Sequence, residues 1–214
     1  MEIDHIFIFS SRQGKEMDDL VDFGFAEGSN RVHPGQGTAN RKIYFENFFL
    51  EIVWVHNEAE IRNESVSKTK LWERSDFLNN GYSPFGLGVV NTPDTDKLFG
   101  SAIRYQPEYF QTGTTFDILT NEQNPYLPWI FRMPLAVPKK QNEPIDHTNG
   151  IRKLTKAVFE IHTKEVSTEF ASLLEANAAV EFHQSSRNAL TLEFDNGRKR
   201  KIEKFDRLNL VISY

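Results

Sequence analysis

The stretch RVHPGQGTANRKIYFENFFLEIVWV, residues 31–55, decides the fold. It begins as a polar loop interrupted by two glycines and ends in a nearly unbroken apolar strand, Phe48–Val55. One carboxylate, Glu51, lies inside that strand. An ionised carboxylate in apolar surroundings is costly unless it is paired, hydrogen-bonded or bound to a metal. The group that meets Glu51 is therefore the first clue to function.

Two strands in this stretch, Ala39–Phe45 and Phe48–Val55, are predicted to form a hairpin around Glu46-Asn47. A two-residue turn sets Lys42 opposite Glu51. Side chains alternate along a strand, so the sheet has one apolar face and one face of mixed polarity. The apolar face, expected under a helix, carries Ile43, Phe45, Leu50, Ile52 and Trp54. The mixed face, expected to line a pocket, carries Asn40, Lys42, Tyr44, Phe49, Glu51 and Val53.

Composition limits the classes of function that fit. The 214 residues are 39% hydrophobic and 26% charged, which is typical of a globular chain. A net charge of −5 argues against a nucleic-acid partner, which requires a strongly basic face. No apolar run is long enough to span a membrane. With no cysteine, the chain has neither disulfides nor thiolate chemistry, and a cytoplasmic location is expected.

The remaining sequence predicts the same order of elements three times, a strand, a helix and further strands. The first unit spans about residues 1–56, and a polar helical connector follows at 57–81, docked through Trp72-Glu73-Arg74. The second unit spans about 82–136 and a linker spans 134–150. A third unit occupies 151–214. In the first unit the predicted elements are a strand Ile3–Phe9, a helix within Ser11–Phe25, and strands Phe25–Val32, Ala39–Phe45 and Phe48–Val55.

The second and third units are predicted from similar patterns. Thr92-Pro93-Asp94 has the composition of a helix start, and Asp195-Asn196-Gly197 that of a turn between two strands. The second unit's strands are expected at Pro84–Val90, Phe116–Thr120 and Tyr126–Met133. The third unit is expected to contain strands Leu154–His162, Val180–His183, Ala189–Phe194 and Leu208–Ser213, with a helix at Ser167–Asn177.

Four segments carry a family resemblance, namely Ile3-Asp4-His5, residues 33–40, Phe49-Leu50-Glu51-Ile52 and His147-Thr148-Asn149-Gly150. Because these four segments occur in this order, the chain resembles the glyoxalase-like domain proteins of the vicinal-oxygen-chelate superfamily. The resemblance implies an α+β fold in which βαβββ units form open, curved mixed sheets around a cavity, as in the glyoxalase and bleomycin-resistance proteins. It assigns residues 1–150 to the glyoxalase-like domain, with residues 151–214 packed on it.

The same resemblance implies a metal site for which this chain has only half the ligands. Metal-dependent members hold a divalent ion with a His or Gln on the first strand and a Glu on the last strand of each unit, and His5 and Glu51 match these positions. The second unit has no imidazole in 84–89 and no carboxylate in 129–132. Two protein ligands are fewer than the three of a catalytic zinc. We therefore expect no metal. Binding of one divalent ion remains an alternative if His162 or Glu193 reaches the cavity.

Each candidate residue could have a structural role instead of a functional one. His5 and Glu51 form either a partial metal site or an acid–base pair in a dry pocket. Alternatively, Glu51 pairs with Lys42 or Arg41 and His5 is a satisfied core residue. The loop that begins at His33 either binds a ligand or merely turns the chain. Its binding candidates are His33, Thr38, Asn40 and Arg41, and alternation directs only one of the last two into the pocket, with the register favouring Asn40.

Four further residues are candidates for substrate binding: Tyr44, Trp129, His147 and Asn149. Trp129 would line the wall, and an Asn-Gly turn after a linker has a simple backbone explanation. The chain is thus expected to be a glyoxalase-like small-molecule enzyme of the lyase, isomerase or dioxygenase type. The alternative is a metal-free protein that binds or sequesters a small molecule. A homodimer is an open alternative to a monomer.

Overall fold

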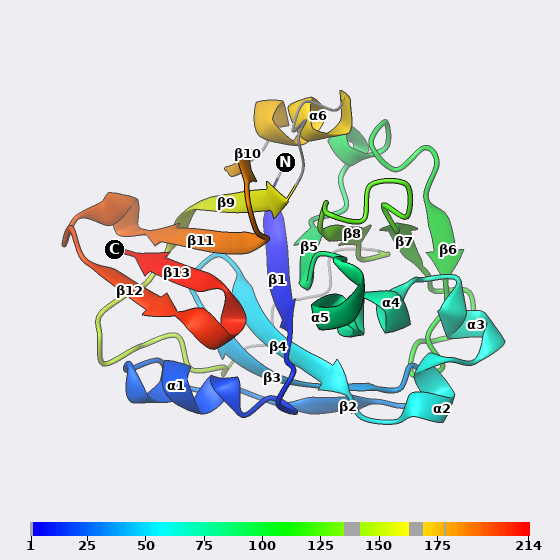
Figure 1. Ribbon diagram of the computed structural model, residues 1–214, viewed down its shortest axis with the longest axis horizontal. Coiled ribbons are helices and arrows are strands. Elements are labelled where there is room, and N and C mark those ends of the chain that lie inside the picture. The colour runs from blue at the N-terminus through cyan, green and yellow to red at the C-terminus, as the bar shows by residue number, and fades with distance from the viewer. Residues whose placement is uncertain (1, 135–141, 163–168, 178) are drawn as a thin grey trace.

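Two β-sheets form the framework of the computed structural model, which describes residues 2–134, 142–162, 169–177 and 179–214 (Figure 1). The first sheet has eight strands in the order β2-β3-β4-β1-β5-β8-β7-β6. These strands are β1 (Ile3–Phe9), β2 (Arg31–His33), β3 (Thr38–Tyr44), β4 (Phe49–Val55), β5 (Phe85–Val89), β6 (Ile103–Tyr105), β7 (Phe116–Leu119) and β8 (Trp129–Arg132).

The eight-stranded sheet consists of two units with the same strand arrangement. In each unit the first strand runs parallel to the last, β1 beside β4 and β5 beside β8. The units meet at the centre, where β1 and β5 pair antiparallel. The predicted α+β fold of repeated units around open, curved sheets is therefore confirmed.

The register of the first hairpin agrees with the prediction. Lys42 is paired with Glu51 and Tyr44 with Phe49. The amide of Phe45 donates to the carbonyl of Phe48 at 2.9 Å, which closes the turn. This register directs Glu51 to the face opposite Leu50 and Ile52, which are fully buried in the apolar core.

The helices are shorter than the sequence predicted. In the first unit, α1 spans only Glu16–Asp22, and the strand expected at 25–32 is reduced to β2 and one bridge between Glu27 and Ile43. In the second unit, the helix expected after Thr92 is a single 3-10 turn, Pro93–Thr95. The few residues before Gly100 leave too little length for a helix to propagate. No helix in the described part of the chain is long and apolar enough to cross a membrane.

The five-stranded second sheet, formed by the third unit, departs from the repeat. Its strand order is β10-β9-β11-β13-β12, and β11 runs parallel to β13. Two adjacent parallel strands cannot be joined by a tight hairpin, so Asp195–Gly197 forms a 3-10 turn that leads to β12, a strand not predicted. The elements are β9 (Leu154–His162), α6 (Glu169–Asn177), β10 (Val180–Ser185), β11 (Ala189–Phe194), β12 (Ile202–Phe205) and β13 (Leu210–Ser213). The expected start of the α6 helix at Ser167, and residues 135–141 of the linker, lie outside the described residues.

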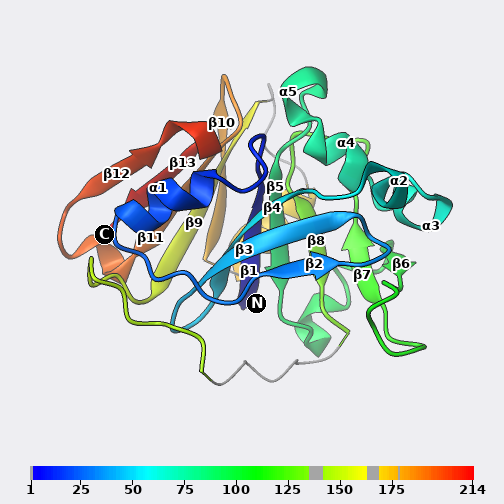
Figure 2. The ribbon, with the colours of Figure 1, turned by 90° about the horizontal axis from the view of Figure 1, so that it is seen from below.

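One apolar core joins the second sheet to one face of the first. Phe194 lies 4.8 Å from Phe45, and Phe159 lies 6.0 Å from Phe85, between ring centroids. Helix α1 covers the second sheet, where Phe23 meets Phe205 at 5.6 Å (Figure 2). Each fully buried side chain of this size contributes roughly 1.5–3 kcal/mol. The opposite face of the eight-stranded sheet is thus left to form the cavity, and the expected domain boundary at residue 150 stays a prediction.

The connector packs on the cavity side and is fixed there by Arg74. It contains α2 (Glu58–Ile61), α3 (Glu64–Ser67), α4 (Leu71–Ser75) and α5 (Phe77–Asn80). The fully buried guanidinium of Arg74 donates to the carbonyls of Ser83 and Leu127 at 3.0 Å and of Thr120 at 2.8 Å. Burial lowers the pKa of Arg74 to about 9. The anchoring role predicted for this segment is confirmed.

Gly86 on β5 provides a test of this packing. A Cβ at this position would lie 2.0 Å from Cε1 of Phe7. The Phe7 ring has little room to move because it packs against Phe9 and Trp129. Gly86→Ala should therefore lower the free energy of unfolding by about 1–3 kcal/mol, as measured by chemical denaturation. The matched control Gly100→Ala, where a Cβ would have no contact shorter than 3.6 Å, should change it by less than about 0.5 kcal/mol. Equal effects of the two substitutions would contradict the packing described.

Candidate functional site

A cavity of roughly 150 Å³ lies on the concave face of the eight-stranded sheet. This is about ten times the space that one water molecule needs. The first unit supplies its polar side, namely Arg31, His33, Gln36, Thr38, Asn40 and Lys42. The second unit supplies aromatic walls that include Tyr109, Phe116, Trp129 and Phe131. His5 and Glu51 lie where the two sides meet.

His5 is oriented from several directions. Its Nδ1 lies 2.5 Å from Oδ1 of Asp4, so an ionised Asp4 accepts the Nδ1 proton. Its Nε2 lies 3.8 Å from Oε2 of Glu51. The ring stacks on Phe49 with centroids 4.2 Å apart and meets the edge of Phe131 at 4.8 Å. The result is an imidazole whose Nε2 is directed at a carboxylate inside the cavity.

Glu51 accepts a hydrogen bond from an amide on the neighbouring strand. Nδ2 of Asn40, on the paired strand β3, donates to Oε1 of Glu51 and leaves Oε2 facing His5. The same Nδ2 lies 3.2 Å from Nε2 of His33, so the two hydrogens of the amide serve two acceptors. The Oδ1 of Asn40 is buried and has no hydrogen-bond partner among the described residues. That unsatisfied acceptor is a cost of fixing Glu51.

A chain of hydrogen bonds continues from Asn40 to the cavity mouth. His33 accepts from Asn40 at Nε2 and donates from Nδ1 to Oγ1 of Thr38 at 2.7 Å. Nε2 of Gln36 donates to the same Thr38 oxygen at 2.9 Å, and Tyr109 donates to Oε1 of Gln36 at 3.0 Å. Burial lowers the pKa of His33 to about 4, so its imidazole is neutral near pH 7 and can take these two roles.

The described residues of the second unit present no groups that could complete a metal site. On β5, Gly88 is paired with His5, and a Cβ there would lie 2.9 Å from Cζ of Phe131 and 3.1 Å from Nδ1 of His5. On β8, Trp129 and Phe131 face the cavity. Within the described residues, no group of three His, Cys, Asp or Glu side chains is placed to hold a metal ion. The donor set of His5 and Glu51 is therefore one short of the three protein ligands of a catalytic zinc and does not fit that ion.

The residues proposed as additional ligands are not at the cavity. Glu193 accepts a hydrogen bond from Thr155 in the second sheet, and His162 packs near Tyr126 with ring centroids 6.0 Å apart. Both belong to the sheet that packs on the other face of the eight-stranded sheet, because β9 and β11 pair with each other. The condition under which a divalent ion stayed open, that His162 or Glu193 reaches the cavity, is therefore not met.

Several predicted substrate-binding residues also lie elsewhere. Arg41 points to the opposite face from Asn40, where it donates to Glu27 at 2.5 Å and to Asp18 at 2.7 Å. Strand alternation causes this, and the same ion pairs raise its pKa. Tyr44 is near the cavity but does not line it, and its hydroxyl lies 3.1 Å from that of Ser29.

His147 and Asn149, at the end of the linker, form hydrogen bonds with the backbone. Nδ1 of His147 accepts from the amide of Ala26 at 3.0 Å, and Nε2 is 3.0 Å from the carbonyl of Tyr44. Oδ1 of Asn149 accepts from the amide of Ile151 at 3.1 Å. Neither residue lines the cavity. His147 fastens the end of the linker to the first unit, and Asn149 holds the local turn that leads to Ile151. Of the predicted set, the structure brings together His5, His33, Thr38, Asn40, Glu51 and Trp129.

Three lining residues with polar groups were missed by the sequence reasoning, Arg31, Gln36 and Tyr109. Arg31 and Gln36 fall inside the quoted stretch, so their positions flanking His33 were an available signal. Tyr109 lies in the loop between β6 and β7 and reaches the first unit through Gln36. Only the pairing of the two units brings this loop to the cavity, and the local sequence gives no sign of it.

Comparison with known protein families gives a match. The family model described as a glyoxalase-like domain matches residues 3–174. The chain belongs to this family. The resemblance drawn from His5 and Glu51 is thereby confirmed at the level of the family. No curated protein matches the sequence.

Solved structures support the fold of this glyoxalase-like protein. A hypothetical protein from Staphylococcus aureus has 9% sequence identity and a TM-score of 0.55, with 99% of this chain and 97% of that chain covered. Methylmalonyl-CoA epimerase from Mycobacterium tuberculosis has 8% identity and a TM-score of 0.37, covering 62% of this chain and 86% of that one. At these identities the first similarity shows the fold alone, and the second is too low to carry an argument.

The neutral state of His33 predicts a pH dependence of stability. Its pKa is about 4 in the folded protein against the ordinary value of 6.5. Between these values the unfolded chain binds a proton that the folded chain does not, so acidification favours unfolding. The free energy of unfolding should fall by up to about 3 kcal/mol from this residue as the pH drops from about 6.5 to 4. Denaturation curves of His33→Gln should lack this part of the slope.

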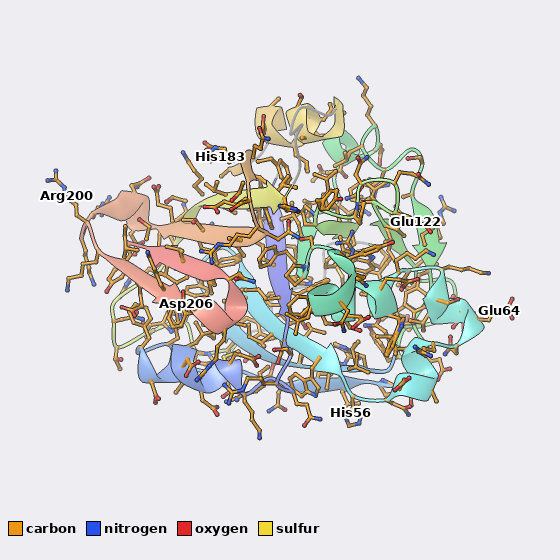
Figure 3. The ribbon with its side chains drawn as sticks, viewed as in Figure 1. His56, Glu64, Glu122, His183, Arg200 and Asp206 are labelled. Atoms are coloured by element: carbon orange, nitrogen blue, oxygen red, sulfur yellow. The ribbon has the colours of Figure 1, made fainter. Side chains whose placement is uncertain are left out.

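A control for this measurement is His56→Gln, since His56 is exposed and projects from the surface (Figure 3). That variant should keep the slope of the unmodified protein. Identical slopes for all three proteins would show that His33 does not lose its charge on folding.

Proposed function

We propose that this chain is a small-molecule enzyme that transfers protons with His5 and Glu51, without a metal ion held by the protein. The observation that carries the proposal is the arrangement Asp4–His5–Glu51. Asp4 holds the Nδ1 proton of His5 at 2.5 Å, and Nε2 faces Oε2 of Glu51 at 3.8 Å. An imidazole oriented by a carboxylate on one side, with its other nitrogen free to exchange protons, is a recurrent acid–base device.

The gap between the two reacting groups supports a role in chemistry rather than in structure alone. A separation of 3.8 Å is too long for a direct hydrogen bond. A substrate atom that lies beside the gap, at the apex of a triangle with Nε2 and Oε2, would be within hydrogen-bond distance of both. Phe49 and Phe131 enclose the imidazole, and apolar surroundings strengthen the electrostatic interactions of the groups inside.

The proposed step uses one proton shared by the pair. The Glu51 carboxylate removes a proton from a carbon next to a carbonyl, and the electron pair of the broken C–H bond moves into the carbonyl to give an enolate. The His5 imidazolium then donates its Nε2 proton to the substrate, either at carbon in an isomerisation or at a departing group in an elimination. Transfer of the first proton from Glu51 to Nε2 restores the starting state.

Lys42 is placed to assist this step. It is buried, lines the cavity and is paired with Glu51 across the two strands. Its ammonium lies 5.7 Å from the ring centre of Tyr44 and 5.9 Å from that of Phe49. We assign it the stabilisation of the developing enolate charge, since a preorganised cation in a dry site favours a transition state in which negative charge develops.

The exchange of substrate protons with solvent tests this function. Small carbonyl compounds are incubated in deuterated water with the chelator-treated protein, and the loss of C–H signals is followed by proton NMR. We expect exchange for at least one compound and a decrease of 10²-fold or more in Glu51→Gln and His5→Gln, because general acid–base groups typically contribute 10²–10⁴. Glu122→Gln removes an exposed carboxylate that does not line the cavity (Figure 3), and it should exchange at the unmodified rate.

The second candidate is a protein that binds a small molecule without changing it. The continuous hydrogen-bond chain from Glu51 to Tyr109 favours it, since a rigid, fully connected wall suits binding as well as catalysis. A compound that binds, is recovered unchanged, and binds equally well to Glu51→Gln would favour this candidate. Exchange that disappears on chelation and returns with a divalent ion would contradict the metal-free mechanism.

A further inference from the structure

The mouth of the cavity carries an arginine that the proposed proton transfer does not use. Arg31, on the edge strand β2, lines the cavity and is exposed to solvent. Its guanidinium carbon lies 4.3 Å from the centre of the Tyr109 ring. Among the described residues the guanidinium has no hydrogen-bond or ion-pair partner. An arginine presents five N–H donors in a planar fork, so its donor edge is available to a ligand.

The position of Arg31 is fixed by the second unit. Tyr109 donates to Oε1 of Gln36 at 3.0 Å, and its ring lies 5.5 Å from that of His33. The loops around them are in close contact, because a Cβ on Gly35 would lie 2.3 Å from Cδ of Glu108. The aromatic ring that supports Arg31 is therefore anchored on both units. A donor held in place before binding loses less freedom when the ligand arrives.

The charges that line the cavity favour an anion. Arg31 and Lys42 are cationic, Glu51 is the one carboxylate among the lining residues, and His33 is neutral because burial lowers its pKa to about 4. With His5 neutral the lining carries one net positive charge, and with His5 protonated it carries two. The positive charge at the mouth of the cavity is that of Arg31.

We propose that Arg31 anchors a carboxylate of the substrate, so that the site accepts small carboxylic acids with a compact apolar body. A carboxylate matches the planar fork of a guanidinium with two parallel hydrogen bonds. From the mouth, the body of such an acid extends towards the aromatic walls formed by Phe7, Trp129 and Phe131. The assignment rests on the proposed function, because the acid is the molecule whose proton His5 and Glu51 would move.

Matched acids and amides test this assignment without any need for turnover. Benzoate with benzamide and butanoate with butanamide are titrated into the protein, and binding is measured by NMR. At least one acid should bind tenfold or more tightly than its amide. Arg31→Gln should abolish that preference, whereas Arg31→Lys should keep part of it because the charge remains but the fork is lost. Arg104→Gln is the matched control, since Arg104 is an exposed arginine on β6 that pairs with Asp117, and it should bind like the unmodified protein.

The same titrations separate this assignment from the proposed function. Glu51→Gln should bind the acid at least as tightly as the unmodified protein, since a negative charge has been removed from the cavity, although it should exchange no substrate proton. Equal binding of acids and amides, a preference that survives in Arg31→Gln, or no binding of either acid would overturn the role of Arg31. Preferential binding of the acids, together with no exchange in any of the carbonyl compounds that have a C–H beside the carbonyl, would keep the anion site and reject the proton-transfer function.

Discussion

The structure depends on how one carboxylate is accommodated in an apolar strand. Glu51 lies on β4 beside Leu50 and Ile52, which are fully buried on the other face. A buried charge without partners would cost several kcal/mol. Asn40 satisfies one carboxylate oxygen, and the other faces His5 across 3.8 Å. The register of the β3–β4 hairpin and the parallel pairing of β1 with β4 bring these groups together, so the site follows from the arrangement of the sheet.

The two units share a topology but contribute different kinds of side chain to the cavity. The first unit provides almost all of its polar groups. The second provides two glycines on β5. A side chain at Gly86 would collide with Phe7 of β1, and one at Gly88 with Phe131 of β8 and with His5. Phe7 and His5 can therefore lie against β5. The second unit therefore gives the pocket a largely aromatic wall.

The sequence predicted the parts of this arrangement that rest on local rules. Alternation and a two-residue turn determined that Asn40, Lys42 and Glu51 share a face and that only one of Asn40 and Arg41 could face the cavity. The roles of His147 and Tyr109 depend on contacts between segments about 70 or more residues apart, which no local pattern encodes. The third unit was predicted as a repeat because its order of elements is the same. Its pairing differs, since β9 runs beside β10 and β11 rather than beside its last strand.

The central claim is that Asp4 holds the Nδ1 proton of His5, so that Nε2 exchanges protons with Glu51 in the cavity. Long-range nitrogen–proton NMR of the imidazole tests it directly, because the two ring nitrogens give distinct signals in each tautomer. The account predicts a protonated Nδ1 near pH 7, and a change in the His5 signals in both Asp4→Asn and Glu51→Gln. A neutral His5 protonated only at Nε2, with signals unchanged in both variants, would contradict it.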